Sequence, residues 1–237
     1  MSKSHFQFKQ FGIDQKGATL KVCTDSCLFG AWVASTMPPS KRVLDIGTGS
    51  SLLALCLAQK HAESEITAIE IDPTSAFLAS QNVANSPWKD RIKVQEIALQ
   101  EFNPENLFNC IVSNPPFFEG QLPSASVTKN LAKHQVGLTK EELIHHAIRM
   151  LDEYGILYVL FPESEGRIFQ QLSSRHGLFL HEEIKVRNKP SGPAFRLMQK
   201  YGFQKKEVKN AEVVIYAQPN VYSPSFVALL KDYYLYL

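Results

Sequence analysis

From Arg42 onward the chain alternates short apolar runs with longer segments of helical period, and this alternation restricts the fold more than any other feature. Parallel strands need long crossovers, which are usually helices, so the pattern is typical of a parallel sheet covered by helices. We therefore predict an α/β protein with a seven-stranded, mostly parallel sheet, an antiparallel last strand and helices on both faces. The predicted strands are residues 43–46, 66–70, 92–96, 109–113, 156–161, 179–186 and 212–217.

The predicted helices between these strands are residues 52–59, 74–85, 140–151 and 166–176. Pro73 suits the start of one of them, and Thr139 with Glu142 forms a capping-box pattern before another. The last two strands have no helix between them. We therefore expect them to pair as an antiparallel hairpin whose long loop is the basic segment 185–209.

The ends of the chain carry weaker signals. Aromatic and polar residues alternate from His5 to Phe11, which suggests a strand, and residues 27–34 have a helical pattern that could lie across the mouth of the sheet. Residues 226–234 have apolar side chains at helical spacing, which predicts a segment that covers the core. We see no linker or repeat and expect one domain over residues 1–237.

Composition excludes several classes of protein. The chain has 237 residues, 44% of them hydrophobic, which is enough for a sizeable core. No apolar run approaches the ~20 residues that a bilayer requires, and the start lacks a signal-like apolar stretch, so we expect a cytoplasmic protein without membrane contact. The four cysteines form no CxxC pair or zinc ligand set, so we expect buried thiols and no metal.

The net charge of +2 alone does not indicate a polyanionic partner. The segment 185–209, however, has many basic residues, a single acid (Glu207) and interleaved aromatics. Such a run is either a solvated face or a nucleic-acid contact surface. On the second interpretation, the contact residues would include Arg196, Lys200, Lys205 and Lys206.

The stretch VLDIGTGSS, residues 43–51, is an apolar strand that runs into a glycine-rich turn before a helix. Glycines allow a close approach of backbone to ligand, and the helix offers free N–H groups. The dinucleotide fingerprint GxGxxG would need glycine where Leu52 stands, which disfavours a nicotinamide cofactor. About twenty residues further on, Glu70 ends the next strand, where a carboxylate can accept from both ribose hydroxyls. Asp72 is instead expected to cap the helix after Pro73.

The pattern Asp-x-Gly-x-Gly resembles the first motif of the Rossmann-like S-adenosyl-L-methionine-dependent methyltransferases. The resemblance implies that Asp45, Gly47, Gly49 and Glu70 bind this cofactor, with Ser51 in place of the family's third glycine. It also leads us to expect an acid at the end of the third strand, but Ala98 stands there. Adenine contacts are therefore assigned to Ala98 and Leu99 through backbone and packing.

The stretch SNPPFF, residues 113–118, follows an apolar run, and its prolines cannot extend a central strand. The motif Asn114-Pro115-Pro116-Phe117 resembles the (D/N)PP(Y/F) motif of enzymes that methylate planar NH2 groups. The amide and Pro115 carbonyls can accept the two amine hydrogens and direct the nitrogen lone pair, while Phe117 can stack on an extruded base. We therefore assign catalysis to Asn114, Pro115 and Phe117.

The N-terminal stretch FKQFGIDQKGATLKVCTDSCLFGAW, together with VLDIGTGSS, NPPFF and YSPSFVALLKDYYL, is similar to the bacterial tRNA adenine-N6 methyltransferases that modify valine tRNA beside its anticodon. The resemblance implies that Lys21, Thr24 and Asp25 lie near the methionine end of the cofactor; Thr24 and Asp25 could equally be a simple helix cap. It further implies a tRNA partner, and we expect a monomer in which residues 1–41 extend over the cofactor site and residues 42–237 form the catalytic core.

Three other functions are compared with this assignment. A glutamine methyltransferase acting on release factors uses the same NPP chemistry, but that group carries a helical domain before the glycine turn, where this chain has only forty-one residues. A DNA adenine methyltransferase would normally need a target-recognition insertion, for which there is no room. A non-catalytic RNA-binding protein on this fold is disfavoured by the intact Asn114, Pro115 and Phe117.

Overall fold

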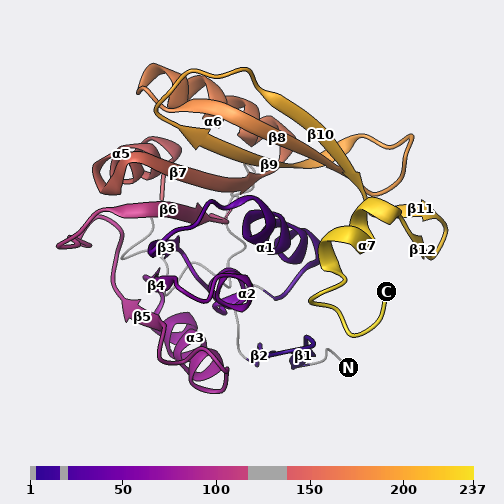
Figure 1. Ribbon diagram of the computed structural model, residues 1–237, viewed down its shortest axis with the longest axis horizontal. Helices are drawn as coiled ribbons and strands as arrows, with labels where there is room; N and C mark the ends of the chain where they lie inside the picture. The colour runs from indigo at the N-terminus through magenta and orange to yellow at the C-terminus, as the bar shows by residue number, and fades with distance from the viewer. Residues whose placement is uncertain (1–3, 17–20, 117–137) are drawn as a thin grey trace, which may run out of the picture.

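The computed structural model describes residues 4–16, 21–116 and 138–237, and its centre is an eight-stranded sheet of order β10-β8-β9-β7-β6-β3-β4-β5 (Figure 1). Short apolar runs form these strands, as the alternation along the chain predicts. Their bounds are β3 Arg42–Ile46, β4 Glu65–Glu70, β5 Ile92–Glu96, β6 Phe108–Ser113, β7 Leu151–Phe161, β8 Phe179–Arg187, β9 Ala194–Gly202 and β10 Lys209–Val214.

All strands of this sheet run parallel except β9, which is antiparallel to both of its neighbours, β7 and β8. The parallel strands therefore all end at one edge, which we call the carboxyl edge, and β9 begins there. The opposite edge, where β9 ends, is the amino edge. In open α/β sheets, ligands bind outside the carboxyl ends of the strands.

The predicted fold class is confirmed, but the predicted hairpin is wrong. The basic segment is not one loop, because it contains β9, and the last strand of the sheet, β10, pairs parallel with β8. Strand β9 buries Leu197, Met198 and Tyr201 between its cations. The many basic residues therefore led us to predict a loop where a partly apolar strand forms. The sheet accordingly has eight strands instead of seven, and its antiparallel strand is an inner one.

Helices cover both faces of the sheet (Figure 1). On one face, α1 (Thr24–Thr36), α2 (Leu52–Lys60) and α7 (Pro224–Leu230) contribute to one apolar cluster, which also includes Val83 of α3 (Pro73–Ala84). On the other face, α5 (Lys140–Met150) and α6 (Glu163–Arg175) pack into a second cluster. Apolar side chains of the central strands alternate between the two clusters, as expected for a sheet buried on both sides.

Local signals for helix starts are confirmed at two places. The Asp72 side chain accepts a hydrogen bond from Ser75 N at 2.8 Å at the start of α3, with Pro73 in the first turn. Thr139 and Glu142 form the expected capping box at the start of α5. The helix α6, by contrast, begins three residues before the predicted Gly166.

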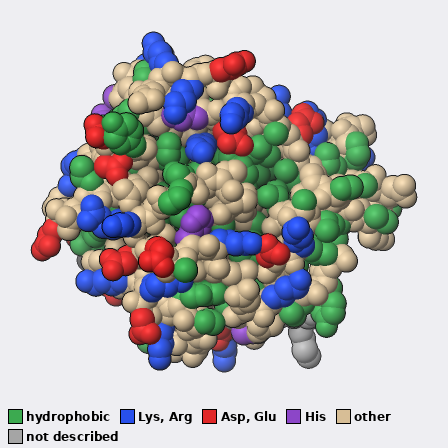
Figure 2. All heavy atoms as spheres, viewed as in Figure 1, with side chains coloured by type: hydrophobic (Ala, Val, Ile, Leu, Met, Phe, Trp, Pro, Cys, Tyr) green, Lys and Arg blue, Asp and Glu red, His purple; other side chains and the backbone are tan. Residues whose placement is uncertain are grey.

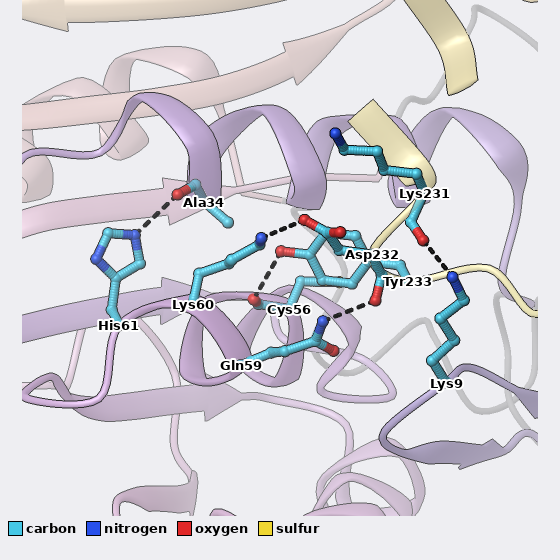
Figure 3. A network of polar contacts seen from close by, with 9 residues as sticks. All are labelled: Lys9, Ala34, Cys56, Gln59, Lys60, His61, Lys231, Asp232 and Tyr233. Carbon is cyan, nitrogen blue, oxygen red and sulfur yellow. Dashed lines mark hydrogen bonds and ion pairs between the residues drawn. The ribbon is translucent and has the colours of Figure 1, made fainter. Parts of the chain in front are cut away.

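The N-terminal region forms a small antiparallel ribbon of β1 (His5–Gln7) and β2 (Gly12–Asp14), so the predicted strand at residues 5–11 is confirmed only in part. The C-terminal tail holds this ribbon in place (Figure 3). Lys9 Nζ donates to the Lys231 carbonyl at 2.6 Å, and Lys9 N donates to the Tyr233 carbonyl at 2.8 Å. Tyr233 donates through its hydroxyl to the Cys56 carbonyl at 3.1 Å, which ties the same tail to α2.

A second short hairpin, β11 (Tyr216–Gln218) with β12 (Val221–Tyr222), projects beside α7 (Figure 1). On the face drawn in Figure 2, Lys and Arg side chains are interspersed with Asp and Glu and do not gather into one patch. Three of the four cysteines are buried, but Cys23 is exposed, so the expectation of buried thiols is wrong at that position. Within the described residues, no helix combines the length and the apolar character that spanning a membrane requires.

Candidate active site

The glycine turn after β3 has three residues in the left-handed region. Gly47, Gly49 and Ser51 have φ values of 69°, 58° and 63°. A Cβ atom placed on either glycine would meet nothing within 4 Å, so the glycines are required by the backbone conformation, and the space beside them is open. Ser51 stands where methyltransferases usually have a third glycine, and it is the N-cap residue of α2.

Glu70 is fixed against this turn by two backbone groups. Its Oε2 accepts from Gly49 N at 2.9 Å, and its Oε1 accepts from Asp72 N at 3.0 Å. Each carboxylate oxygen can accept a further hydrogen bond. The half-buried Glu70 carboxylate is therefore oriented at the carboxyl edge and retains the capacity to accept from a pair of hydroxyls, such as those of a ribose.

Asp45 lies at the base of the same turn and is fully buried. Its Oδ2 accepts from the Thr48 hydroxyl at 2.6 Å. Burial raises the pKa of the Asp45 carboxyl to about 7, because water no longer solvates the charged form. A cationic ligand group near the turn would favour the ionised form of Asp45.

Ala98 and Leu99 follow the end of β5, beside Glu70. Ile97 N donates to the Glu70 carbonyl at 2.9 Å, which brings Ala98 to the same edge. The side chain of Leu99 is only 5% exposed and belongs to the second apolar cluster, so it supports this corner by packing. Glu96, the acid nearest in sequence, lies opposite Glu70 in the β4–β5 register and is exposed.

Asn114 follows β6, where the chain leaves the sheet as the prolines predict. Its Nδ2 donates to the Ser26 hydroxyl at 3.0 Å. Its Oδ1 is buried and has no hydrogen-bond partner within the described parts of the chain. Because Ser26 uses the amino half of this amide, the carbonyl half remains an acceptor next to the buried Pro115. Phe117, the predicted stacking residue, lies outside the described residues.

Ser26 was not predicted as a site residue, because nothing in the sequence Cys23-Thr24-Asp25-Ser26 indicates that its hydroxyl lies beside Asn114. These residues begin α1, and the N-cap is Cys23, with no side-chain capping bond. The interpretation of Thr24 and Asp25 as a simple helix cap is therefore wrong. Lys21, just before this helix, is exposed.

Asp25 and Arg196 form an ion pair, with 2.7 Å between Arg196 Nε and Asp25 Oδ2. Sequence reasoning assigned these residues to different partners, one to the cofactor and one to nucleic acid. Asp25 is buried, and it also accepts from Ser26 N at 3.1 Å. The pair connects the start of α1 to the start of β9, because both lie at the carboxyl edge.

The other three residues that were predicted to contact nucleic acid do not form a cluster with Arg196. Lys200 is half-buried in β9, where its Nζ donates to the Thr36 carbonyl at 3.3 Å and lies 5.4 Å from the centre of the Tyr158 ring. Burial lowers the pKa of Lys200. Lys205 and Lys206 follow the end of β9, so they lie at the amino edge, far along the sheet from Asn114. Over the described ranges, no cluster of His, Cys, Asp and Glu could hold a metal ion.

Comparison with known proteins places this geometry in a family. The model of the methyltransferase small domain matches residues 29–166, which include the glycine turn, Glu70 and Asn114. Relatives named tRNA1(Val) (adenine(37)-N6)-methyltransferase match along nearly their full lengths. Those from Trichodesmium erythraeum (99% of each chain) and Dyadobacter fermentans (98% of each chain) are 35% and 38% identical, respectively.

Solved structures with low sequence identity show the same fold. A predicted O-methyltransferase from Agrobacterium tumefaciens aligns over 88% of this chain and 96% of its own with a TM-score of 0.65 at 16% identity. A ribosomal protein L11 methylase from Lactobacillus delbrueckii subsp. bulgaricus aligns over 82% and 84%, with a TM-score of 0.56 at 17% identity. The family match and the full-length relatives together show that this chain belongs to the tRNA1(Val) (adenine(37)-N6)-methyltransferase family.

Proposed function

We propose that the protein methylates the exocyclic N6 of the adenine beside the anticodon of valine tRNA, with S-adenosylmethionine as the methyl donor. The observation that carries this proposal is the Asn114 amide, whose Oδ1 is a buried acceptor without a partner among the described residues, whereas Nδ2 is engaged by Ser26. An unpartnered buried carbonyl is costly unless a ligand completes it. The full-length relatives support the tRNA substrate by their names.

The residues at the glycine turn fit the cofactor. Glu70 could accept from the ribose hydroxyls, and the open space beside Gly47 and Gly49 would admit a ligand close to the backbone. Asp45, which accepts from Thr48 at the base of the turn, would help to hold the turn in this shape. When bound, S-adenosylmethionine supplies an electrophilic methyl group. Ala98 would border the adenine from the end of β5, while Lys21, Thr24 and Asp25 would approach from the α1 side.

The N6 amine of the substrate is a weak nucleophile, because conjugation with the adenine ring delocalises its lone pair. Asn114 Oδ1 and the Pro115 carbonyl would each accept one N6 hydrogen, which favours the geometry in which the lone pair is directed outward. No strong base is required, since the proton can leave after the new bond forms. Phe117 would stack on the base.

A defined assay tests this function. Unmodified valine tRNA is incubated with the protein and S-adenosylmethionine, and the digested RNA is analysed by mass spectrometry. We expect N6-methyladenosine in the anticodon loop with the wild type and with Tyr154→Ala, a surface variant at the amino edge. Methyl transfer to a release-factor glutamine, with all tRNA unmodified, would contradict the proposal.

We further propose that the chain is one domain and acts as a monomer in the cytoplasm, where its tRNA substrate would be. The N-terminal ribbon, α1, α2 and α7 contribute to one apolar cluster, which supports the single domain. The molecular mass from light scattering, with and without tRNA, tests the monomer. A mass that doubles without RNA would contradict it.

A further inference from the structure

A hollow of about 320 Å³ opens at the carboxyl edge beside the ion pair of Asp25 and Arg196. Its volume falls within the range of ordinary small-ligand sites. Gly47, Gly49, Glu70 and Asn114 do not line it, whereas Thr24 and Asp25, which the family resemblance assigned to the cofactor, do. The hollow therefore adjoins the methyl-transfer site at the start of α1 and is not part of the glycine turn. It is lined by Cys23, Thr24, Asp25, Asn188, Phe195, Arg196, Ile215 and Tyr216.

An ordered stack of aromatic rings borders this hollow. The Tyr216 ring stacks on the Tyr222 ring, with a centroid distance of 5.2 Å and an interplanar angle of 16°. The Tyr222 ring stacks in turn on the buried Phe226 ring, with a centroid distance of 4.4 Å and an interplanar angle of 15°. Tyr216 is held in position by these contacts and is still 38% exposed. Phe195 contributes a second ring, with the Arg196 guanidinium 5.5 Å from its centroid. Rings that are held in place lose little entropy when a flat ligand stacks on them.

Polar groups complete the lining. Asn188 lies in the turn between β8 and β9, and its backbone carbonyl accepts from Tyr216 N at 3.1 Å, which joins the turn to the aromatic stack. The Asn188 side chain is exposed, and no group of the described residues forms a hydrogen bond with its side-chain amide. A side-chain amide offers a donor and an acceptor side by side, which matches the edge of a nucleobase.

Two hydrogen bonds connect the hollow to the methyl-transfer site. Asn114 Nδ2 donates to Ser26 Oγ at 3.0 Å, and Ser26 Oγ is 2.9 Å from the Sγ of Cys23, which lines the hollow. The start of α1 therefore separates the two sites by about one helical turn. A flexible strand of RNA with one base at Asn114 would bring an adjacent nucleotide to this hollow.

We propose that the hollow binds the base of a nucleotide next to the target adenine, stacked on Tyr216 and Phe195 with Asn188 at its edge. This inference rests on the proposed function. Proteins bind single-stranded RNA loops by splaying bases onto aromatic rings and by hydrogen bonds to the base edges. The hollow thereby selects a loop in which the target adenine and one neighbouring base can both leave the stack.

The test uses an anticodon stem-loop RNA with the full-length protein. We measure binding and single-turnover methylation for wild type, Tyr216→Ala and Asn188→Ala, on the intact RNA and on RNAs that lack the base on either side of the target. Tyr216→Ala should weaken binding of the intact RNA roughly 5- to 100-fold, which is the usual effect of losing one stacking ring. On the RNA that lacks the correct neighbouring base, wild type and variant should bind equally.

Equal losses on all RNAs would overturn the proposal, because the Tyr216 ring would then not contact a neighbouring base. Asn188→Ala, at an exposed turn, provides the same comparison if Tyr216→Ala does not fold. Tyr154→Ala is the control, since Tyr154 is 72% exposed near the start of β7, at the amino edge. If the wild type methylates no RNA, the proposed function fails; if it methylates RNA and the variants are unaffected, only the hollow is misassigned.

Discussion

Two parts of the carboxyl edge are held together in different ways: the proposed cofactor half, which contains the glycine turn and Glu70, and the proposed substrate half, which contains Asn114, Ser26 and Arg196. On the cofactor side, Glu70 is fixed by backbone N–H groups, and its partner Gly49 is only 21 residues away in the chain. On the substrate side, side chains from distant segments meet: Asn114 bonds Ser26 across 88 residues, and Arg196 pairs with Asp25 across 171.

This difference implies that the halves respond differently to mutation. Backbone donors persist when side chains change, so cofactor binding should depend mainly on Glu70 and on the glycines. The substrate half depends on how α1 lies across the sheet. Changes at Asn114 or Ser26 should alter methyl transfer and RNA binding while leaving cofactor affinity intact.

The largest effect should come from Asn114→Ala. Loss of the positioned acceptor should lower single-turnover methylation of tRNA at least about a hundredfold, the scale of effect when a reacting group is misplaced. The affinity for S-adenosylmethionine, measured by calorimetry, should stay within a factor of two of the wild type. Ser26→Ala keeps the acceptor but removes its orienting partner, and should show a smaller loss. Normal turnover in Asn114→Ala would remove the assigned role.

The converse variant is Glu70→Ala. Removing a carboxylate that accepts charge-assisted hydrogen bonds should weaken cofactor binding by about 1.5–3 kcal/mol, or roughly ten- to a hundredfold. RNA binding in the absence of cofactor should be unchanged, as a gel-shift titration can show. If both affinities fall together, the two halves are not independent.

Asp45→Asn tests the buried carboxyl through the pH dependence of stability. Burial raises the pKa of Asp45 to about 7, above its ordinary value of 3.8, so the folded state holds this proton more tightly than the unfolded state does. The stability from this group is therefore complete at low pH and is lost as pH rises through 7. From pH 5 to pH 8, the wild type should lose on the order of 2 kcal/mol of unfolding free energy relative to Asp45→Asn. Chemical denaturation at the two pH values measures this difference. If the wild type and Asp45→Asn lose the same unfolding free energy between pH 5 and pH 8, the prediction is wrong.

The smallest effect should come from cations at the amino edge. Replacing Lys205 and Lys206 together by Ala should change the salt dependence of tRNA binding less than Lys189→Ala, because Lys189 is exposed in the β8–β9 turn at the carboxyl edge. A cation that contacts phosphate contributes about one unit to the slope of log affinity against log salt. A larger change in the double variant would mean that tRNA wraps around to the amino edge.

The cofactor half was predictable because its signals are local. Glycines at positive φ, a strand-ending acid and the capping Asp72 are each encoded within a few residues, and the structure places them as expected. Strand β9 was missed for the opposite reason. Its cations are held by partners far away in the chain, such as Asp25 for Arg196 and the Thr36 carbonyl for Lys200, so their charge indicated a loop where a strand forms.

The contact between Ser26 and Asn114 was also not predictable from the sequence. Helix α1 carries the Ser26 hydroxyl to the end of β6, a placement set by packing among α1, α2 and α7 that no short motif encodes. The same holds for the hollow beside Tyr216, which three separate segments of the chain assemble.

The pairing of Lys9 with the Tyr233 and Lys231 carbonyls has a consequence for biosynthesis. During translation the N-terminal ribbon leaves the ribosome first, but the tail that fixes it emerges more than two hundred residues later. Contacts so distant in sequence form late in folding. The N-terminal ribbon can therefore take its final place only after the C-terminal tail has been synthesised. Two distant segments of the chain accordingly complete this part of the fold together, at a late stage of synthesis.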